Sequence, residues 1–256
     1  MIGLNGGLSA AYIIVTQQFF PELYKSYGET VCILHRHSLR STTHTMSGYT
    51  LTYFPLRGRA EAIRLLLGDQ GVSWTDDEVQ MQDWAAGLRD LKKNAVFGQI
   101  PRFQEEDFVL YQSCTILRYL ARKYGLSGSN EREIAIIEMM NDGVEDLRLK
   151  YYKFIFWDNE ANKEKFLEEL ATQLGYFERI LSNNANGTKF LVGDKISYAD
   201  YNFLDTLQCY LDLSPTCLSG FPLLSSYVER LLKRPKLSEY LKSEGRKRRP
   251  IIPKRT

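Results

Sequence analysis

The chain has 256 residues, of which 44% are hydrophobic and 25% charged, and it contains only eight prolines. This composition excludes disordered and collagen-like chains and predicts a folded soluble protein, and the length slightly favours two domains over one. The formal net charge of +2 is unevenly placed: the first 45 residues sum to +1 and the tail after Gly245 to +6, which leaves −5 for residues 46–245. A mildly acidic body argues against nucleic-acid binding.

Histidine is confined to the first 44 residues, at positions 35, 37 and 44. From Met46 onward the sequence therefore excludes Ser–His and Cys–His nucleophile pairs, an imidazole general base and any zinc site with a histidine ligand. The cysteines of that part, Cys114, Cys209 and Cys217, are odd in number and lack a CxxC spacing, so we expect neither a disulfide framework nor a thiol–metal cluster. If the protein is an enzyme, a group other than histidine activates its nucleophile.

The first 45 residues differ from the rest of the chain. Their apolar run at 8–15 is short and lacks the preceding basic residue of a signal peptide, and no segment of the chain approaches the roughly 20 apolar residues of a membrane span. Residues 35–45 are rich in Ser, Thr and basic residues, as transit peptides are, but Glu22 and Glu29 argue against that interpretation. We expect residues 1–45 to be an extension that is disordered or absent from the native protein, with Met46 as the working start.

Strand and helix signals alternate after Met46. Residues 49–54 are β-branched and aromatic, which predicts a strand, and Pro55 and Gly58 end it. Apolar residues at positions 60, 63, 66 and 67 have helical spacing, and Gly71 predicts the end of that helix. Residues 74–79 predict a second strand, ahead of an irregular stretch that contains Trp84.

A hairpin and a helix follow. Residues 101–104 and 108–111 flank an acidic turn and predict the hairpin, and Ser113 is expected to cap the helix, whose apolar stripe lies at positions 116, 117 and 120. Strand, helix, strand, hairpin and helix together predict a small α/β domain over residues 46–125.

The second half of the chain predicts helices almost throughout. A Gly- and Ser-rich linker precedes helices expected over residues 131–158, 164–181, 197–213 and 222–233, with a short turn after Pro235. Ser197 and Asp200 resemble a capping box at the start of a buried helix. We therefore expect an all-α domain over residues 131–245. The basic tail, residues 246–256, is most simply a solvated segment, with a localisation signal or a nucleic-acid patch as alternatives. Its two prolines disfavour helix.

Five strings of residues then occur in order: YFPLRGR at 53–59, FGQIP at 97–101, LYQS at 110–113, NDGVEDLR at 141–148 and ISYADY at 196–201. None is specific alone, but the ordered set closely resembles the pi class of the cytosolic glutathione transferases. The resemblance runs from about Tyr49 to the mid-240s. It implies an α/β thioredoxin-like N-terminal domain and an all-α C-terminal domain, in agreement with the periodicity.

An enzyme of this family must ionise the thiol of glutathione near neutral pH. A free thiol has a pKa of about 8.5, and lowering it by ~2 units requires ~2.7 kcal/mol of preference for the anion. The resemblance implies that Tyr53, at the end of the first strand, donates a hydrogen bond to the sulfur. A hydroxyl donor fits a domain without histidine, although outside these motifs Tyr53 would be an ordinary strand tyrosine, one of 16 in the chain.

The resemblance also implies the rest of the glutathione site. Gln112 and Ser113 lie where a strand gives way to a helix, and backbone N–H groups and the helix dipole there favour the γ-glutamyl carboxylate. Arg59 organises charge near the thiol. The Ile100–Pro101 bond is expected to be cis, with Ile100 paired to the cysteinyl backbone. The whole expected set is Tyr53, Arg59, Trp84, Lys92, Gln99, Ile100, Pro101, Gln112, Ser113 and Asp146 of the partner subunit, with Tyr53 and Arg59 catalytic.

The glycyl end of glutathione is assigned to Trp84 and a lysine. The loop that follows Trp84 is about two residues longer than in the family, so we choose Lys92 and keep Lys93 and Arg89 as alternatives. Asp146, which would reach the glutathione amine from the other subunit, implies a homodimer, and Phe97 matches the aromatic residue that inserts between helices of the partner.

The electrophile pocket is implied at Phe54, Leu56, Tyr152 and Phe156. Phe156 stands where the pi class commonly has a tyrosine, so we expect weaker epoxide opening and Michael addition, with aromatic substitution less affected. Tyr152 is bulkier than the usual aliphatic residue and should narrow the pocket.

The resulting expectation is a cytoplasmic, homodimeric glutathione S-transferase that conjugates the glutathione thiolate to hydrophobic electrophiles in detoxification. Glutathione is its cosubstrate, and we expect no other cofactor, no metal, and neither nucleic-acid nor membrane partners. Two alternatives remain open from the sequence: a glutathione-dependent isomerase or peroxidase that uses the same site, and a non-catalytic ligand-binding or kinase-regulating protein.

Overall fold

The computed structural model describes residues 48–87, 90–158 and 160–252. Its contacts divide the chain after Ser47, and every described residue belongs to the second unit, residues 48–256. The extension predicted for residues 1–45 and the alternative glycyl-end residue Arg89 lie outside the described residues.

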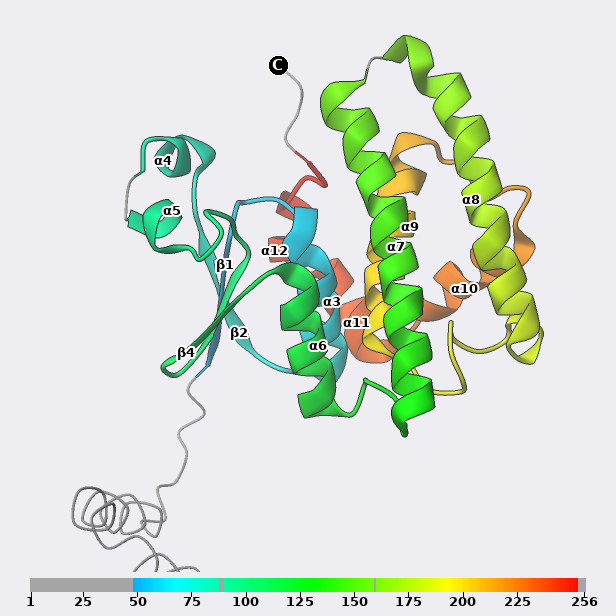
Figure 1. The fold of residues 1–256 in the computed structure, drawn as a ribbon, viewed down its shortest axis with the longest axis horizontal. Helices are drawn as coiled ribbons and strands as arrows, with labels where there is room; N and C mark the ends of the chain where they lie inside the picture. Colours follow the sequence, from blue (N-terminus) through cyan, green and yellow to red (C-terminus); the bar gives the residue numbers. More distant parts are fainter. Residues whose placement is uncertain (1–47, 88–89, 159, 253–256) are drawn as a thin grey trace, which may run out of the picture. The chain divides into compact units, whose positions relative to one another are not determined.

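The N-terminal part of this unit is built on a mixed four-stranded sheet of order β2-β1-β3-β4 (Figure 1). The strands are β1 (Tyr49–Tyr53), β2 (Trp74–Glu78), β3 (Arg102–Glu105) and β4 (Phe108–Tyr111). β1 pairs with β2 in parallel, and its pairing with β3 is antiparallel, with Leu51 opposite both Asp76 and Phe103. β3 and β4 form the predicted hairpin. β2 is an edge strand, so its acid-rich sequence is paired on one side only.

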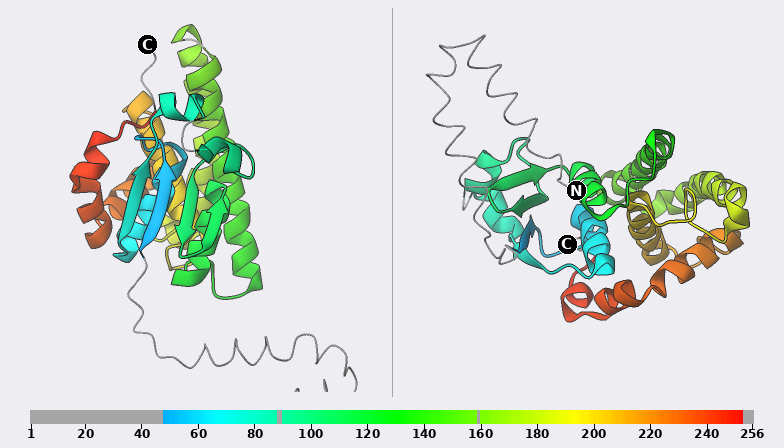
Figure 2. Two further views of the ribbon diagram at one scale, coloured as in Figure 1. Left: turned by 90° about the vertical axis from the view of Figure 1, so that its left-hand side faces the viewer. Right: turned by 90° about the horizontal axis from the view of Figure 1, so that it is seen from below.

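Two helices lie on one face of the sheet, between it and the helical part of the chain, α3 (Glu61–Gln70) and α6 (Ser113–Tyr124) (Figures 1 and 2). The short 3-10 helix η1 (Gly58–Ala60) leads into α3, which ends at Gly71 in a left-handed conformation, as predicted. Two further short helices, α4 (Met81–Ala85) and α5 (Leu91–Asn94), occupy the stretch around Trp84 that was expected to be irregular.

The C-terminal part is all helical, which confirms the prediction from periodicity. Its α-helices are α7 (Glu131–Trp157), α8 (Lys163–Asn183), α9 (Tyr198–Leu213), α10 (Pro222–Leu232), α11 (Pro235–Lys242) and α12 (Glu244–Arg248), with short 3-10 helices η3 (Glu160–Asn162) and η4 (Ala185–Gly187). α7 and α8 run antiparallel in Figure 1, and α9 packs against both α7 and α3. Among the described residues no helix is both long and apolar enough to cross a membrane.

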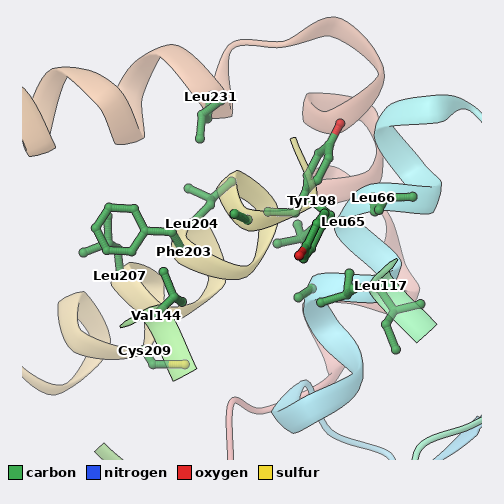
Figure 3. Packing of buried hydrophobic residues seen from close by; sticks show 14 of the residues in the cluster. Leu65, Leu66, Leu117, Val144, Tyr198, Phe203, Leu204, Leu207, Cys209 and Leu231 are labelled. Atoms are coloured by element: carbon green, nitrogen blue, oxygen red, sulfur yellow. The ribbon is translucent and has the colours of Figure 1, made fainter. Parts of the chain in front are cut away.

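Helix α9 forms the centre of the core that joins the two parts. Figure 3 shows its side chains Tyr198, Phe203, Leu204 and Leu207 among residues of the other helices, including Leu117 of α6. Each such buried apolar side chain stabilises the fold by roughly 1.5–3 kcal/mol. The predicted capping box begins this helix: the Ser197 N–H donates to the Asp200 carboxylate at 2.8 Å. Asp200, which is fully buried, also accepts from the Leu191 N–H and the Tyr227 hydroxyl, so its carboxylate has partners without water.

Three local expectations were wrong. Ser113 is the first residue of α6 and not its cap; the N-cap is Gln112, whose side chain makes no capping bond. The residues after Pro235 form the eight-residue helix α11 where a turn was expected. The basic tail is not simply solvated, because Arg246 and Arg249 are buried at 6% and 4% exposure and pair with acids on α3 and β2. The helix α12 ends two residues before Pro250, so proline and helix are compatible there.

Candidate active site

A cavity of about 520 Å³ opens beside the end of β1, with walls from the loop before β3 and from the first turn of α6. Its size lies in the range of small-molecule sites. The cavity brings together eight of the residues expected from the sequence and three that were not. The expected ones are Phe54, Arg59, Trp84, Gln99, Ile100, Pro101, Gln112 and Ser113, and the others are Gly98, Cys114 and Glu145.

Tyr53 lies at the end of β1 with its side chain buried, and its hydroxyl accepts a hydrogen bond of 3.0 Å from the Arg59 backbone N–H. The turn is close-packed: a Cβ at Gly58 would lie 2.7 Å from that hydroxyl, and Gly58 has a φ of 42°, so only glycine fits. Burial raises the pKa of the Tyr53 hydroxyl, while the Arg59 N–H and the charges of Arg59, Arg64 and Arg148 offset part of the rise. Tyr53 is therefore protonated at neutral pH, which leaves its O–H available as a hydrogen-bond donor.

Arg59 is held from two sides. Its guanidinium forms an ion pair with Glu145 of α7 and lies over the Tyr152 ring, 5.2 Å from the centroid. Burial alone would raise the pKa of Glu145, but the charges of Arg148 and Arg59 outweigh it and hold the pKa below its usual range. Asn202 of α9 also donates to Glu145 at 2.9 Å. The arginine that faces the cavity is thus fixed by the helical part of the protein.

The opposite wall is formed where β4 meets α6. Gln112 has a φ of 70°, a left-handed value that is uncommon for residues other than glycine, and its amide donates to the Gln99 side chain at 3.4 Å. The Ile100–Pro101 bond is cis, as expected. Ser113 begins the 12-residue helix α6 beside the cavity. Backbone N–H groups at a helix start favour an anion, so this wall suits a carboxylate.

Cys114 also lines the cavity. Its sulfur accepts a weak hydrogen bond of 3.8 Å from the Asn141 side chain. Burial raises the pKa of the Cys114 thiol above its usual value, with the nearby Glu145 charge acting in the same direction. The thiol is therefore protonated at neutral pH and is a poor nucleophile.

Several expected residues do not line this cavity, and Tyr53 is one of them: it is buried next to the lining residues Phe54 and Arg59. Leu56 is buried against the β1 turn, and Lys92, Lys93, Phe97 and Asp146 are exposed on the surface of the described chain. Tyr152 and Phe156 pack on each other along α7, with ring centroids 5.9 Å apart, and Phe156 remains 49% exposed. Trp84 meets Phe54 edge to face at 5.9 Å, inside the cavity.

Comparison with known proteins decides the family. Residues 49–122 match the sequence model described as "Glutathione S-transferase, N-terminal domain", and residues 145–244 match the corresponding C-terminal domain. Glutathione S-transferase P 2 of Bufo bufo is 91% identical over 205 residues, which cover 80% of this chain and 97% of the relative. The chain belongs to the glutathione S-transferase family.

Other relatives place it in the pi class of glutathione S-transferases. Glutathione S-transferase P 1 of Xenopus laevis is 64% identical over 82% of this chain and 99% of its own length. The solved pi-class glutathione S-transferase of Onchocerca volvulus superposes with a TM-score of 0.75 at 40% identity, covering 80% of this chain and 98% of that one. The thioredoxin-like fold and the pi-class assignment expected from the motifs are thereby confirmed.

Two side chains of this glutathione S-transferase cavity were missed by sequence reasoning, Glu145 and Cys114. Asp146, the neighbour of Glu145, was chosen from the motif. A signal for Glu145 was present, because it lies four residues after Asn141 and three before Arg148, so that all three share one side of α7. Both neighbours are fully or almost fully buried. Within the described residues no group of His, Cys, Asp and Glu side chains could hold a metal ion.

Proposed function

We propose that this protein conjugates the thiolate of glutathione to hydrophobic electrophiles. The observation that carries the proposal is the buried, protonated Tyr53 hydroxyl, which lies at the end of β1 and is held by the Arg59 N–H at 3.0 Å. A hydroxyl in this setting donates to a sulfur anion and does not compete with it as a base. The absence of histidine from residues 46–256 leaves this hydroxyl as the natural donor.

Glutathione is proposed to lie along the cavity with its γ-glutamyl carboxylate at Gln112 and Ser113. Its cysteinyl backbone pairs with Ile100, beside Gln99 and Pro101. Its glycyl end is directed to Trp84 and Lys92, with Lys93 and Arg89 as alternatives, and its amine to Asp146 of the partner subunit. The N-terminus of α6 supports this orientation of glutathione, because its backbone N–H groups and helix dipole favour an anion at that end of the cavity.

The reaction needs no group beyond these. The thiol proton passes to solvent, and the Tyr53 O–H donates to the sulfur, so the anion is stabilised in a partly dry site. The thiolate then forms a carbon–sulfur bond with the electrophile, and the electrons of the broken bond leave with the leaving group or onto the accepting atom. Arg59, which lines the cavity and is ion-paired with Glu145, places its guanidinium near the proposed position of the sulfur.

The electrophile is proposed to bind beside Phe54, which lines the cavity, and to extend toward Leu56, Tyr152 and Phe156. The tilted rings of Tyr152 and Phe156 along α7, with centroids 5.9 Å apart, would supply aromatic contacts for it. Because Phe156 carries no hydroxyl, the site offers no acid there for a leaving oxygen, so aromatic substitution is favoured over epoxide opening.

We further propose that the protein is a cytoplasmic homodimer, with Phe97 as an interface anchor, and that it has no nucleic-acid or membrane partner and no cofactor besides its cosubstrate. Phe97 supports the dimer because it is a large apolar side chain with 64% exposure in the loop that borders the cavity.

The decisive experiment is an ultraviolet titration of the thiolate of bound glutathione, together with turnover of an aromatic electrophile. We expect the thiol pKa to fall about 2 units below its free value of ~8.5. A bound thiol whose pKa stays near its free value would contradict the proposal. Isomerase and peroxide-reduction assays on the same preparation separate the two other enzymatic activities, and a lowered pKa without turnover would indicate a binding protein.

A further inference from the structure

The C-terminal strap, residues 246–252, lies against the turn that carries the active-site arginine. The Arg57 N–H donates to the Pro250 carbonyl at 2.8 Å, and the Gly58 N–H donates to the Ile251 carbonyl at 3.0 Å. The next N–H along the chain, that of Arg59, is the one that donates to the Tyr53 hydroxyl. Three consecutive backbone N–H groups of one turn thus have acceptors: two carbonyls of the strap and the Tyr53 hydroxyl oxygen.

Two buried arginines anchor the strap. Arg249 reaches Asp76 at 2.8 Å and Glu78 at 2.9 Å, both on the same face of the edge strand β2. Arg246 forms an ion pair with Glu61 of α3 and donates to Gln208 of α9 at 3.0 Å. A buried arginine that loses its carboxylate is strongly destabilising, so these pairs hold the strap firmly.

Acids on β2 and α3 are the partners of the tail arginines Arg246, Arg248 and Arg249. Asp76 faces α3, where Arg64 meets it at 2.8 Å, and the carboxylates of Asp76 and Glu78 are both less than one fifth exposed. Glu61 is fully buried and is also contacted by Arg64 and the Tyr240 hydroxyl. One arginine of α3 cannot balance three carboxylates, and the tail supplies the remaining positive charge from outside the sheet.

We infer, on the basis of the proposed function, that Arg246 and Arg249 are positioning residues for the thiol chemistry: they fix the strap, and the strap holds the turn of residues 57–59 so that the Arg59 N–H stays on the Tyr53 oxygen. A hydroxyl whose oxygen accepts a hydrogen bond donates more strongly, because such bonds polarise one another. Release of the strap leaves two N–H groups of the turn without their carbonyls and loosens this chain of hydrogen bonds at its start.

The charges that act on Tyr53 come from outside the strap. Its hydroxyl lies in the field of Arg59, Arg64 and Arg148, which belong to the turn, to α3 and to α7. The strap arginines therefore do not act on the thiol by direct contact. Their effect on it passes through the backbone of the turn.

The test compares the full-length parent with three variants, two single substitutions and one shortened chain. R249Q removes the two contacts of Arg249 to β2 and leaves the exposed pair of Arg248 with Glu78 at 2.7 Å. A chain that ends at Arg249 keeps the arginine pairs but lacks both carbonyls of the strap, and K247Q is the control. Lys247 is 57% exposed and pairs only locally, with Glu244 of its own helix at 2.8 Å, so K247Q removes the same charge without touching the turn. The readouts are the thiol pKa of bound glutathione, glutathione affinity, turnover and the melting temperature.

We expect R249Q and the shortened chain to raise the bound thiol pKa by about half a unit, which lowers the thiolate fraction below that pKa about threefold. The turnover number should fall by the same factor while glutathione affinity changes less than about twofold. K247Q should match the parent in all readouts. A lowered melting temperature with an unchanged thiol pKa in both variants would assign the strap a purely structural role and overturn the inference. If the parent itself fails to lower the thiol pKa, the proposed function fails first, and the inference with it.

Discussion

The backbone N–H of Arg59 donates to the Tyr53 hydroxyl over 3.0 Å, while the side chain of the same Arg59 pairs with Glu145 on α7. One residue therefore joins the hydroxyl at the end of β1 to the helical part of the chain. Its backbone acts on the donor and its charge acts on the cavity, so the two parts of the fold meet chemically as well as sterically at this position.

The substitution Y53F removes the hydroxyl proposed to donate a hydrogen bond to the sulfur anion. It should raise the thiol pKa of bound glutathione toward ~8.5 and reduce turnover by about a hundredfold, because one preorganised hydrogen bond to that anion is lost. Glutathione affinity should change little, since the peptide contacts remain. The thiolate absorbance as a function of pH measures the first effect. The control is Y176F, on an exposed tyrosine of α8. Undiminished turnover in Y53F would show that another group stabilises the thiolate.

Removal of the Glu145 charge, E145Q, should destabilise the protein by about 2 kcal/mol at pH 7, because Arg59 and Arg148 lose a partly buried partner. The pKa of Glu145 is held below its usual range. Its carboxylate therefore stabilises the fold above the unfolded pKa of about 4.3, and this contribution is lost as the pH falls through the folded pKa.

The difference in unfolding free energy between parent and E145Q should thus be constant from pH 7 to about pH 5 and shrink below about pH 4. Urea unfolding at a series of pH values measures it. D142N is the matched control, because Asp142 is 69% exposed and its pair with Arg118 should contribute little. A difference that persisted unchanged at low pH would show that Glu145 acts through packing and not through its charge.

Addition of a hydroxyl to the electrophile site, F156Y, should raise kcat/KM for Michael acceptors and epoxides by about tenfold, since the new phenol can donate to the developing oxyanion. The rate of aromatic substitution should stay within about twofold, as that reaction has less need of an acid. Because Phe156 is half exposed, we expect no loss of stability. The measurement is the ratio of the two activities for parent and variant; an equal change in both would argue that Phe156 acts only through apolar contact.

Loss of the exposed aromatic ring, F97S, should weaken the proposed dimer by at least about tenfold in dissociation constant, as expected for an aromatic anchor at an interface. Sedimentation velocity over a range of protein concentrations measures it. M81S removes a comparably exposed apolar side chain from α4 and serves as the control, with an unchanged association state expected. If F97S sediments as the parent does at every concentration, Phe97 is not an interface anchor.

Local signals predicted the elements well. Gly71 ends α3 and the Ser197–Asp200 pair begins α9, both as predicted, because caps and turns depend on residues next to them in the chain. Gln112 shows the limit of such signals. By propensity Ser113 was the better N-cap. In the structure the chain turns from β4 into α6 at Gln112, which therefore becomes the N-cap and has a φ of 70°.

Among the residues that line the cavity, Arg59 and Gln112 were expected from motifs that coincide with turns, whereas Glu145, which a helix face brings there, was missed. Glu145 and Asp146 are equally acidic neighbours, yet successive residues of a helix point about 100° apart. Only the packing of α7 against α9 turns Glu145 toward the cavity and leaves Asp146 in solvent.

The sequence by itself determined the two-part architecture, the boundaries of the strands and of the longer helices to within a few residues, and the family motifs, because periodicity, caps and turns are local properties. It also determined that the tail is basic. It did not determine the short helices α4, α5, α11 and α12. What the tail contacts was decided by the tertiary structure alone: Arg249 meets Asp76 and Glu78 across more than 170 residues of chain. Net charge sums over a segment and carries no information on distance, whereas the energy of an ion pair depends on distance and burial.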